Sequence, residues 1–146
     1  MKIRIKVVKE ASSSNKISFP FDIVMLLKRI LKGDSKFARD QEHFWVVGLD
    51  GANHVKYVDL VSLGLVNRSL VHPREVFRLA IHEGISSVIL AHNHPSGSIE
   101  PSQDDVAITR QLKEAGKIVG IAVLDHVIIS NEPDAQYYSF KEHETL

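Results

Sequence analysis

Two histidines, His92 and His94, lie two positions apart after an apolar run, in the segment AHNHPSGSIEPSQDD. In an extended chain, side chains at positions i and i+2 point to the same side. Both imidazoles are therefore expected on one face. Two imidazole nitrogens on one face suit a borderline metal ion such as zinc. The pair predicts a metal site, and a catalytic site of this kind needs a third protein ligand.

Asp105 is the preferred third ligand. Ser102 is a good helix N-cap, and Asp105 lies three positions later, where a capping box directs a side chain back towards the cap. The loop 95–101, which contains two prolines and a glycine, must bring this helical turn back to the histidines. Asp104 is the alternative ligand, although its side chain lies about 100° away around the helix. A purely capping Asp105 is the other interpretation.

A His92–His94–Asp105 site would leave a fourth position open for water, as catalytic zinc sites do. Iron or manganese are alternative metals for such ligands. The chain has no cysteine, which excludes disulfides, cysteine zinc sites and thiol nucleophiles. His82-Glu83 lacks the second histidine of H-E-x-x-H, and the G-x-S-x-G, Walker A and G-x-G-x-x-G motifs are absent.

The elements that must position these residues mix strands and helices. Apolar periodicity predicts several helices and a mixed sheet. Some neighbouring strands are expected to form hairpins, with Asp50-Gly51 as one turn. We expect an α/β domain with a mixed β-sheet flanked by helices. The expected strands are 2–9, 42–49, 55–65, 86–91, 121–129 and 137–141, and the expected helices are 22–31, 71–83 and 102–115.

Composition restricts the classes of protein. The 146 residues are 44% hydrophobic and 25% charged, which is typical of one globular domain. Eighteen basic residues balance eighteen acidic ones, so no overall field attracts nucleic acid. No apolar run approaches the length of a membrane span, and the start lacks the apolar centre of a signal peptide. We therefore expect a cytoplasmic protein that does not bind membranes.

The N-terminal segment alternates basic and apolar residues. Lys2, Arg4 and Lys6 are expected on one face of an edge strand, where lysines discourage aggregation. The same face is a candidate surface for nucleic acid, and an edge strand is a candidate for pairing in a homo-oligomer. We expect residues 1–146 to form a single domain, with a strand and helix extension over 1–35 and a core over 42–141.

The metal-site residues also resemble a known family. His92-x-His94-Pro95 followed by Pro101-Ser102-x-x-Asp105 resembles the JAMM (MPN+) metalloprotease motif. The fuller string HNHPSG…PS…D…T, with VHPREVFRLAI before it and LDHVII after it, is similar to the bacterial RadC branch, from about residue 42 to residue 140. The resemblance implies a JAB/MPN-type α/β domain with cytidine-deaminase-like layering. It further implies one zinc ion per chain, held by the two histidines and Asp105, and hydrolysis of peptide or isopeptide bonds in a peptide or protein substrate.

The resemblance also suggests catalytic roles for Glu42 and Ser102. The family uses an upstream glutamate as general acid/base, and Glu42 occupies the corresponding place before a buried strand. Glu75 is the alternative, although in a proline-initiated first turn it suits the helix dipole better. Ser102 is similar to a family serine that donates a hydrogen bond to the developing oxyanion, and a simple N-cap is the other interpretation.

Asp125-His126 is a second polar pair within apolar surroundings. The pair would either support the metal site from outside the ligand set or form a core contact with no catalytic part. Two alternatives to hydrolysis stay open. One is a nucleic-acid-associated module, suggested by the basic N-terminal strand and the link of the RadC branch to DNA repair. The other is a metal-bearing interaction scaffold without turnover.

Overall fold

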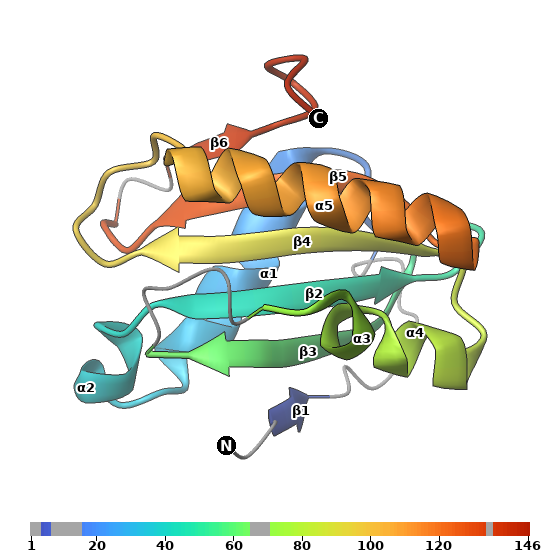
Figure 1. Ribbon diagram of the computed structural model, residues 1–146. Coiled ribbons are helices and arrows are strands. Elements are labelled where there is room, and N and C mark those ends of the chain that lie inside the picture. Colours follow the sequence, from blue (N-terminus) through green and yellow to red (C-terminus); the bar gives the residue numbers. More distant parts are fainter. Residues whose placement is uncertain (1–3, 7–15, 65–70, 134–135) are drawn as a thin grey trace.

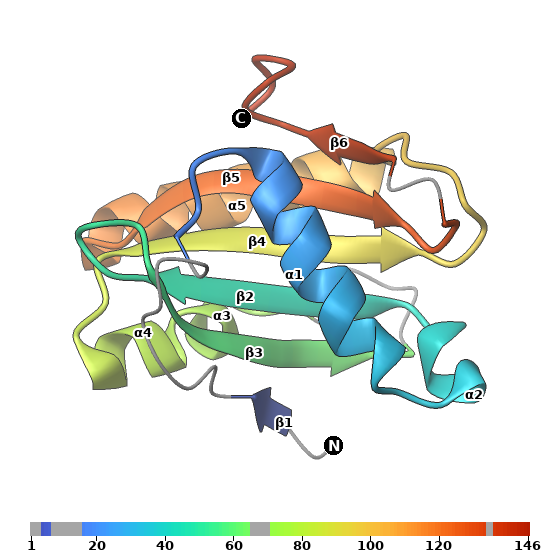
Figure 2. The ribbon, with the colours of Figure 1, turned by 180° about the vertical axis from the view of Figure 1, so that it is seen from behind.

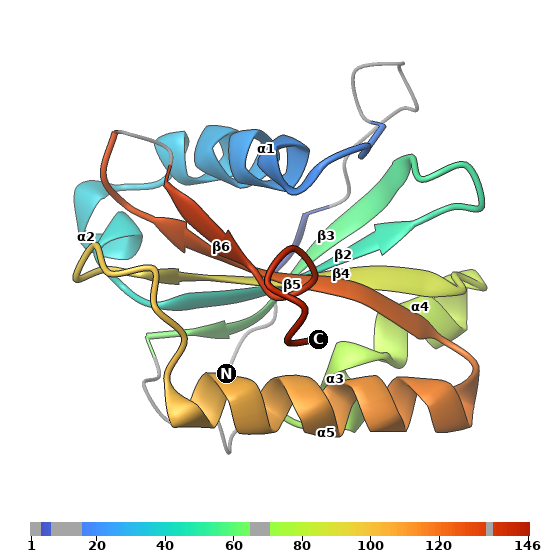
Figure 3. The same ribbon diagram turned by 90° about the horizontal axis from the view of Figure 1, so that it is seen from above.

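The computed structural model describes residues 4–6, 16–64, 71–133 and 136–146. Its centre is a twisted six-stranded sheet with helices on both faces (Figure 1). Figure 3 shows the layers from above: α1 lies on one face, and α3, α4 and α5 lie on the other. The predicted α/β class with a mixed sheet is confirmed.

The sheet has the strand order β1-β3-β2-β4-β5-β6. Among the strands that the structure describes, only β4 and β5 run parallel, and all other neighbours are antiparallel. Helix α5 connects the two parallel strands, which is the crossover connection that such a pair requires. The strands are β1 (Arg4–Lys6), β2 (His43–Leu49), β3 (Val55–Leu63), β4 (Ser87–His94), β5 (Ala122–Ser130) and β6 (Tyr137–Ser139).

The two longer helices cover opposite faces of the sheet and have clear start and stop signals. Pro20 begins α1, and the Asp22 carboxylate accepts hydrogen bonds from the backbone N–H groups that precede the helix. Helix α5 begins after the N-cap Ser102 and ends at Gly120, whose φ of 78° is the left-handed conformation that favours glycine. The helices are α1 (Pro20–Lys32), α2 (Lys36–Arg39), α3 (Pro73–Val76), α4 (Arg78–Glu83) and α5 (Gln103–Val119).

Alternate strand residues form two separate apolar cores. Trp45 and Val47 of β2 face α1, which crosses the sheet diagonally in Figure 2. Phe44 and Val46, the residues between them, face α3 and α5. Because the side-chain period of a strand is two, His92 shares the α5 face of β4 with Leu90 and not the α1 face with Ala91.

Several expected element boundaries differ from the structure by one or two residues, and three expected elements are wrong by more. The single helix predicted over 71–83 is two short helices, because the backbone at Phe77 (φ −97°, ψ −4°) ends α3 and precedes α4. Strand β4 continues to His94 and does not end at Ala91, since it remains paired with β5 up to His94 opposite Ser130. Helix α5 extends to Val119, beyond the predicted end at residue 115.

The β2–β3 hairpin is confirmed, but its left-handed residue is Asn53 (φ 65°). The Asp50 carboxylate accepts from the backbone N–H groups of Ala52 and His54 and so holds the turn. Of the N-terminal strand predicted over 2–9, residues 4–6 are described; the rest of it and the end of the strand predicted over 55–65 lie outside the described residues. Within the described ranges, no helix is long and apolar enough to span a bilayer.

Candidate metal centre

The C-terminal end of β4 and the first turn of α5 lie together on one face of the sheet. A tight turn follows β4, in which Gly97 (φ 85°) donates its backbone N–H to the carbonyl of His94 over 3.0 Å. That φ is favourable only for glycine. The loop then returns to Ser102, and α5 packs back across β4 and β5 (Figure 1). Asp105 in the first turn of α5 therefore meets the histidines of β4.

Three side chains converge at this junction. The Nε2 atoms of His92 and His94 are 2.9 Å apart. One carboxylate oxygen of Asp105 lies 3.3 Å from Nε2 of His92, and the other lies 3.2 Å from Nε2 of His94. His92 and Asp105 are buried, whereas the His94 side chain keeps 15% of its surface exposed. The structure thus brings together the three residues that were expected to hold a metal.

The three groups form a strongly coupled electrostatic cluster. The hydrogen bond to Asp105 raises the pKa of His94 above its ordinary value, although burial opposes the shift. Burial on its own would raise the pKa of Asp105, but the adjacent His92 and His94 imidazoles outweigh it and hold that pKa far below the ordinary carboxyl range. Asp105 is consequently a carboxylate with its negative charge directed at two imidazole nitrogens, an arrangement that suits a cation between them.

Helix capping holds the Asp105 carboxylate in place. The Asp105 backbone N–H donates to Oγ of Ser102 over 3.0 Å, and the Ser102 backbone N–H donates to Oδ2 of Asp105 over 2.9 Å. The predicted capping box is therefore present. Asp104, the alternative ligand, is exposed on the next part of the turn and lines the neighbouring cleft.

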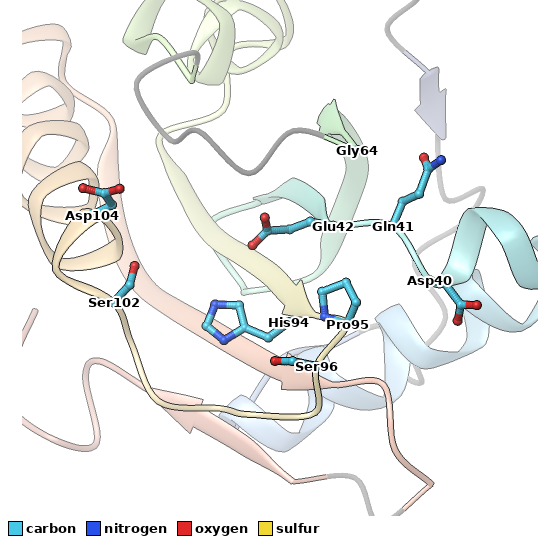
Figure 4. Close-up of a pocket in the computed structure, with 9 residues that line it drawn as sticks. All are labelled: Asp40, Gln41, Glu42, Gly64, His94, Pro95, Ser96, Ser102 and Asp104. Atoms are coloured by element: carbon cyan, nitrogen blue, oxygen red, sulfur yellow. The ribbon is translucent and has the colours of Figure 1, made fainter.

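An open cleft of about 570 Å³ adjoins the cluster and is lined by His94, Glu42, Ser102 and the Pro95–Ser96 turn. Figure 4 shows the Glu42 carboxylate extending from the start of β2 into the space beside His94, with Ser102 on the α5 side. One ligand atom from each of Glu42, His92 and His94 lies within 4.8 Å of the others. This group could itself hold a metal ion, and two of its members, Glu42 and His94, line the cleft.

Asn93, the buried residue between the two histidines, holds the backbone on both sides of Glu42. Its side-chain oxygen accepts the His43 N–H over 2.6 Å, and its amide nitrogen donates to the Gln41 carbonyl over 3.1 Å. The Glu42 carbonyl accepts from the Gly64 N–H over 2.8 Å. The glutamate is therefore carried on a backbone segment that is tied to β4 and to the end of β3.

Glu75, the alternative acid/base, lies elsewhere. It occupies the first turn of α3, where its Oε2 atom is buried without a hydrogen-bond partner, and it raises the pKa of Asp59 by repulsion. Glu75 is not among the residues that line the cleft. Of the two glutamates, Glu42 is the one that the structure brings to the histidines.

The Asp125-His126 pair splits between the two faces of β5. Asp125 accepts hydrogen bonds from the Ser139 hydroxyl and the Lys141 N–H, so it ties β5 to the C-terminal segment. Burial raises its pKa. His126 instead points to the α5 face, where its Nε2 atom lies 2.7 Å from Nδ1 of His92. Only His126 contacts the candidate metal centre.

Comparisons with known proteins show the family of this chain. Residues 19–145 match the family model of the RadC-like JAB domain. The chain belongs to the RadC-like JAB domain family. It is 54% identical over 106 residues to a UPF0758 protein of Pelobacter propionicus, which covers 73% of this chain and 45% of the relative. It is 47% identical over 126 residues to a UPF0758 protein of Caldanaerobacter subterraneus, with 86% and 51% covered.

A UPF0758 protein of Rubrobacter xylanophilus is 47% identical over 130 residues, 89% of this chain and 53% of the relative. The chain thus spans about half the length of these curated relatives. The RadC-like match includes every residue of the candidate site, from Glu42 to His126.

Two site residues of this RadC-like JAB domain were given no role from the sequence, although the threonine belongs to the quoted RadC-like string. Thr109 lies one helical turn after Asp105, and its Oγ1 is 2.5 Å from Nδ1 of His126. Its spacing of four from Asp105 was an available signal, since such residues share a helix face. Asn93 was visible as a polar residue between two histidines, but its hydrogen bonds depend on β2 and could not be read from the sequence.

Proposed function

We propose that this RadC-like JAB domain is a zinc-dependent hydrolase of peptide or isopeptide bonds. The observation that carries the proposal is the convergence of His92, His94 and Asp105 at the end of a cleft that Glu42 also enters. Two imidazoles, one carboxylate and a nearby glutamate are the groups that metal-assisted hydrolysis needs.

The donor set fits zinc. Ligand atoms about 2.0–2.1 Å from a tetrahedral ion lie about 3.3 Å from one another. The Nε2 atoms of His92 and His94 are 2.9 Å apart, and each of them lies 3.2–3.3 Å from a different oxygen of Asp105, which is close to that spacing. Three protein ligands would leave one position for water or substrate, and the partly exposed His94 lines the cleft from which either could approach. We expect one zinc ion per chain.

A bound zinc ion would supply a Lewis acid that polarises the scissile carbonyl and makes water a nucleophile near neutral pH. Glu42 is positioned to accept the proton of the attacking water and to deliver it to the leaving amine. Its backbone is held by Asn93 and Gly64, while its carboxylate faces the cleft.

Ser102 can donate a hydrogen bond to the developing oxyanion. Its Oγ accepts the Asp105 N–H, a contact that uses the oxygen and leaves the hydroxyl hydrogen for another acceptor. The residue is exposed and lines the cleft. Capping and oxyanion stabilisation are thus compatible roles for the same side chain.

The test begins with the metal. Protein purified without an affinity tag is analysed for zinc, and hydrolysis of a quenched-fluorescence peptide library and of a lysine isopeptide is then followed with and without a chelator. We expect stoichiometric zinc and chelator-sensitive cleavage in the parent, and loss of both in His92→Ala and Asp105→Ala. His82→Ala, at an exposed position on α4, is the matched histidine control. A parent protein that binds no metal contradicts the proposal.

A further inference from the structure

The imidazole of His92 is held from both sides. Its Nε2 atom faces Asp105 and His94, and is the atom available to a metal ion. Its Nδ1 atom lies 2.7 Å from Nε2 of His126. A hydrogen bond between two neutral imidazoles uses one proton, so one of these two nitrogens must donate and the other must accept. The identity of the donor determines whether Nε2 of His92 carries a proton or a lone pair.

Thr109 determines the direction of this hydrogen bond. Its hydroxyl donates to the backbone carbonyl of Asp105 over 2.6 Å, and its Oγ1 lies 2.5 Å from Nδ1 of His126. A hydroxyl has only one hydrogen. Because that hydrogen is given to the carbonyl, Oγ1 must accept the hydrogen on Nδ1 of His126. The neutral His126 ring then has a lone pair on Nε2, which can only accept from His92.

We infer that His126 and Thr109 are positioning residues that hold His92 in the tautomer with its proton on Nδ1 and its lone pair on Nε2. The inference rests on the proposed zinc site. The chain of hydrogen bonds runs from His92 through His126 and Thr109 to the carbonyl of Asp105, and so it begins and ends at two proposed ligands. The opposite direction would place a proton on the metal-binding nitrogen.

Packing around the rings keeps this series of hydrogen bonds in one arrangement. His92, His126 and Thr109 are each 2% exposed or less. The His126 ring stacks on Phe140, with centroids 4.9 Å apart, and meets the edge of Phe44 at 5.6 Å. Because apolar rings enclose the imidazole, its nitrogens must find partners within the protein, and a lost partner is costly.

The first test measures zinc affinity and the absorption spectrum of the cobalt-substituted protein. Thr109→Val removes the hydroxyl while keeping the shape of the side chain, and should weaken zinc binding about 10- to 100-fold and alter the cobalt spectrum. Thr109→Ser should restore both. Thr145→Val is the matched control, because that hydroxyl also donates to a backbone carbonyl but lies on the C-terminal segment.

The second test determines which ring nitrogen of each histidine carries a hydrogen. Nitrogen NMR of the zinc-loaded parent should place a hydrogen on Nδ1 of both His92 and His126. In the zinc-free protein, where no ion fixes the His92 proton, Thr109→Val should allow the other tautomer of His126. A zinc-bound parent with the His126 hydrogen on Nε2, or a Thr109→Val protein with parental affinity and cobalt spectrum, overturns the positioning role alone. A parent that binds no zinc overturns the proposed function itself, so the two failures are distinguishable.

Discussion

Ser102 and Asp105 bond to each other in both directions, since each backbone N–H donates to the other side chain over 2.9–3.0 Å. This reciprocal contact serves the helix and the metal centre together. It stabilises the start of α5, and it fixes the carboxylate that approaches the two imidazoles. A substitution at Ser102 should therefore affect stability and activity by separate routes.

Ser102→Ala and Ser102→Gly separate these routes. Alanine at an N-cap costs about 1 kcal/mol of unfolding free energy, whereas glycine costs a few tenths. Both lack the hydroxyl, so both should lower kcat/KM about 10²–10³-fold if it stabilises the oxyanion. Urea unfolding and peptidase kinetics measure the two effects. A glycine variant with parental activity would restrict Ser102 to a capping role.

The Glu42→Gln variant should bind zinc as the parent does but should lose most of its hydrolytic activity. The amide has nearly the shape of the carboxylate but cannot take up a proton, so we expect kcat to fall about 10²–10⁴-fold while the zinc content stays stoichiometric. Glu75→Gln is the matched control, because Glu75 does not line the cleft, and it should leave kcat unchanged. Loss of zinc from Glu42→Gln would show instead that this residue is a ligand.

Asn93→Asp tests the support beneath Glu42. The aspartate can still accept the His43 N–H, but it cannot donate to the Gln41 carbonyl as the amide does. Leaving buried groups without partners costs about 1–3 kcal/mol, and the expected result is a lower unfolding free energy with a reduced kcat. Chemical denaturation and kinetics provide the measurement. Parental values for both would mean that Asn93 does not hold the segment.

Asp59→Asn should stabilise the protein in a pH-dependent manner. Burial raises the pKa of Asp59, and nearby Glu75 adds to the shift while Arg78 opposes it. Because the folded-state pKa is above the unfolded-state value, the charged form costs stability once the pH exceeds the ordinary value of 3.8. That cost increases with pH and becomes constant above the folded-state pKa.

Thermal melts of the parent and Asp59→Asn across a pH series measure this difference. The variant should have the higher Tm at neutral pH, and the gain should disappear in acid, where Asp59 is protonated in both states. The Oδ1 atom of Asp59 is buried without a hydrogen-bond partner, so the substitution breaks no hydrogen bond at that atom. A lower Tm for the variant at neutral pH would indicate that the attraction to Arg78 dominates.

Local sequence patterns were sufficient to predict the pair of histidine ligands and the capped first turn of α5. His92 and His94 share a face because the period of a strand is two, and Ser102 and Asp105 face each other because a helix begins between them. The order of strands and helices also followed from apolar periodicity, together with the α/β class. These features depend on residues close together in the chain.

The bounds of other elements depended on contacts with segments that lie far away in the sequence. Polar residues after Ala91 suggested the end of a strand, yet β4 continues because β2 pairs with it as far as His92 and β5 as far as His94. The break at Phe77 was equally invisible to periodicity, since Phe77 is itself a buried apolar residue.

The sequence by itself determined which residues could bind a metal, because residue type and short spacing dictate that chemistry. Only the tertiary structure decided that Asp125 faces away from His92 while His126 contacts it, and that Thr109 completes the chain of hydrogen bonds. The physical reason is that the direction of a hydrogen bond and the partner of a buried group are set by which segments pack together. Packing between distant segments leaves no regular spacing in the chain.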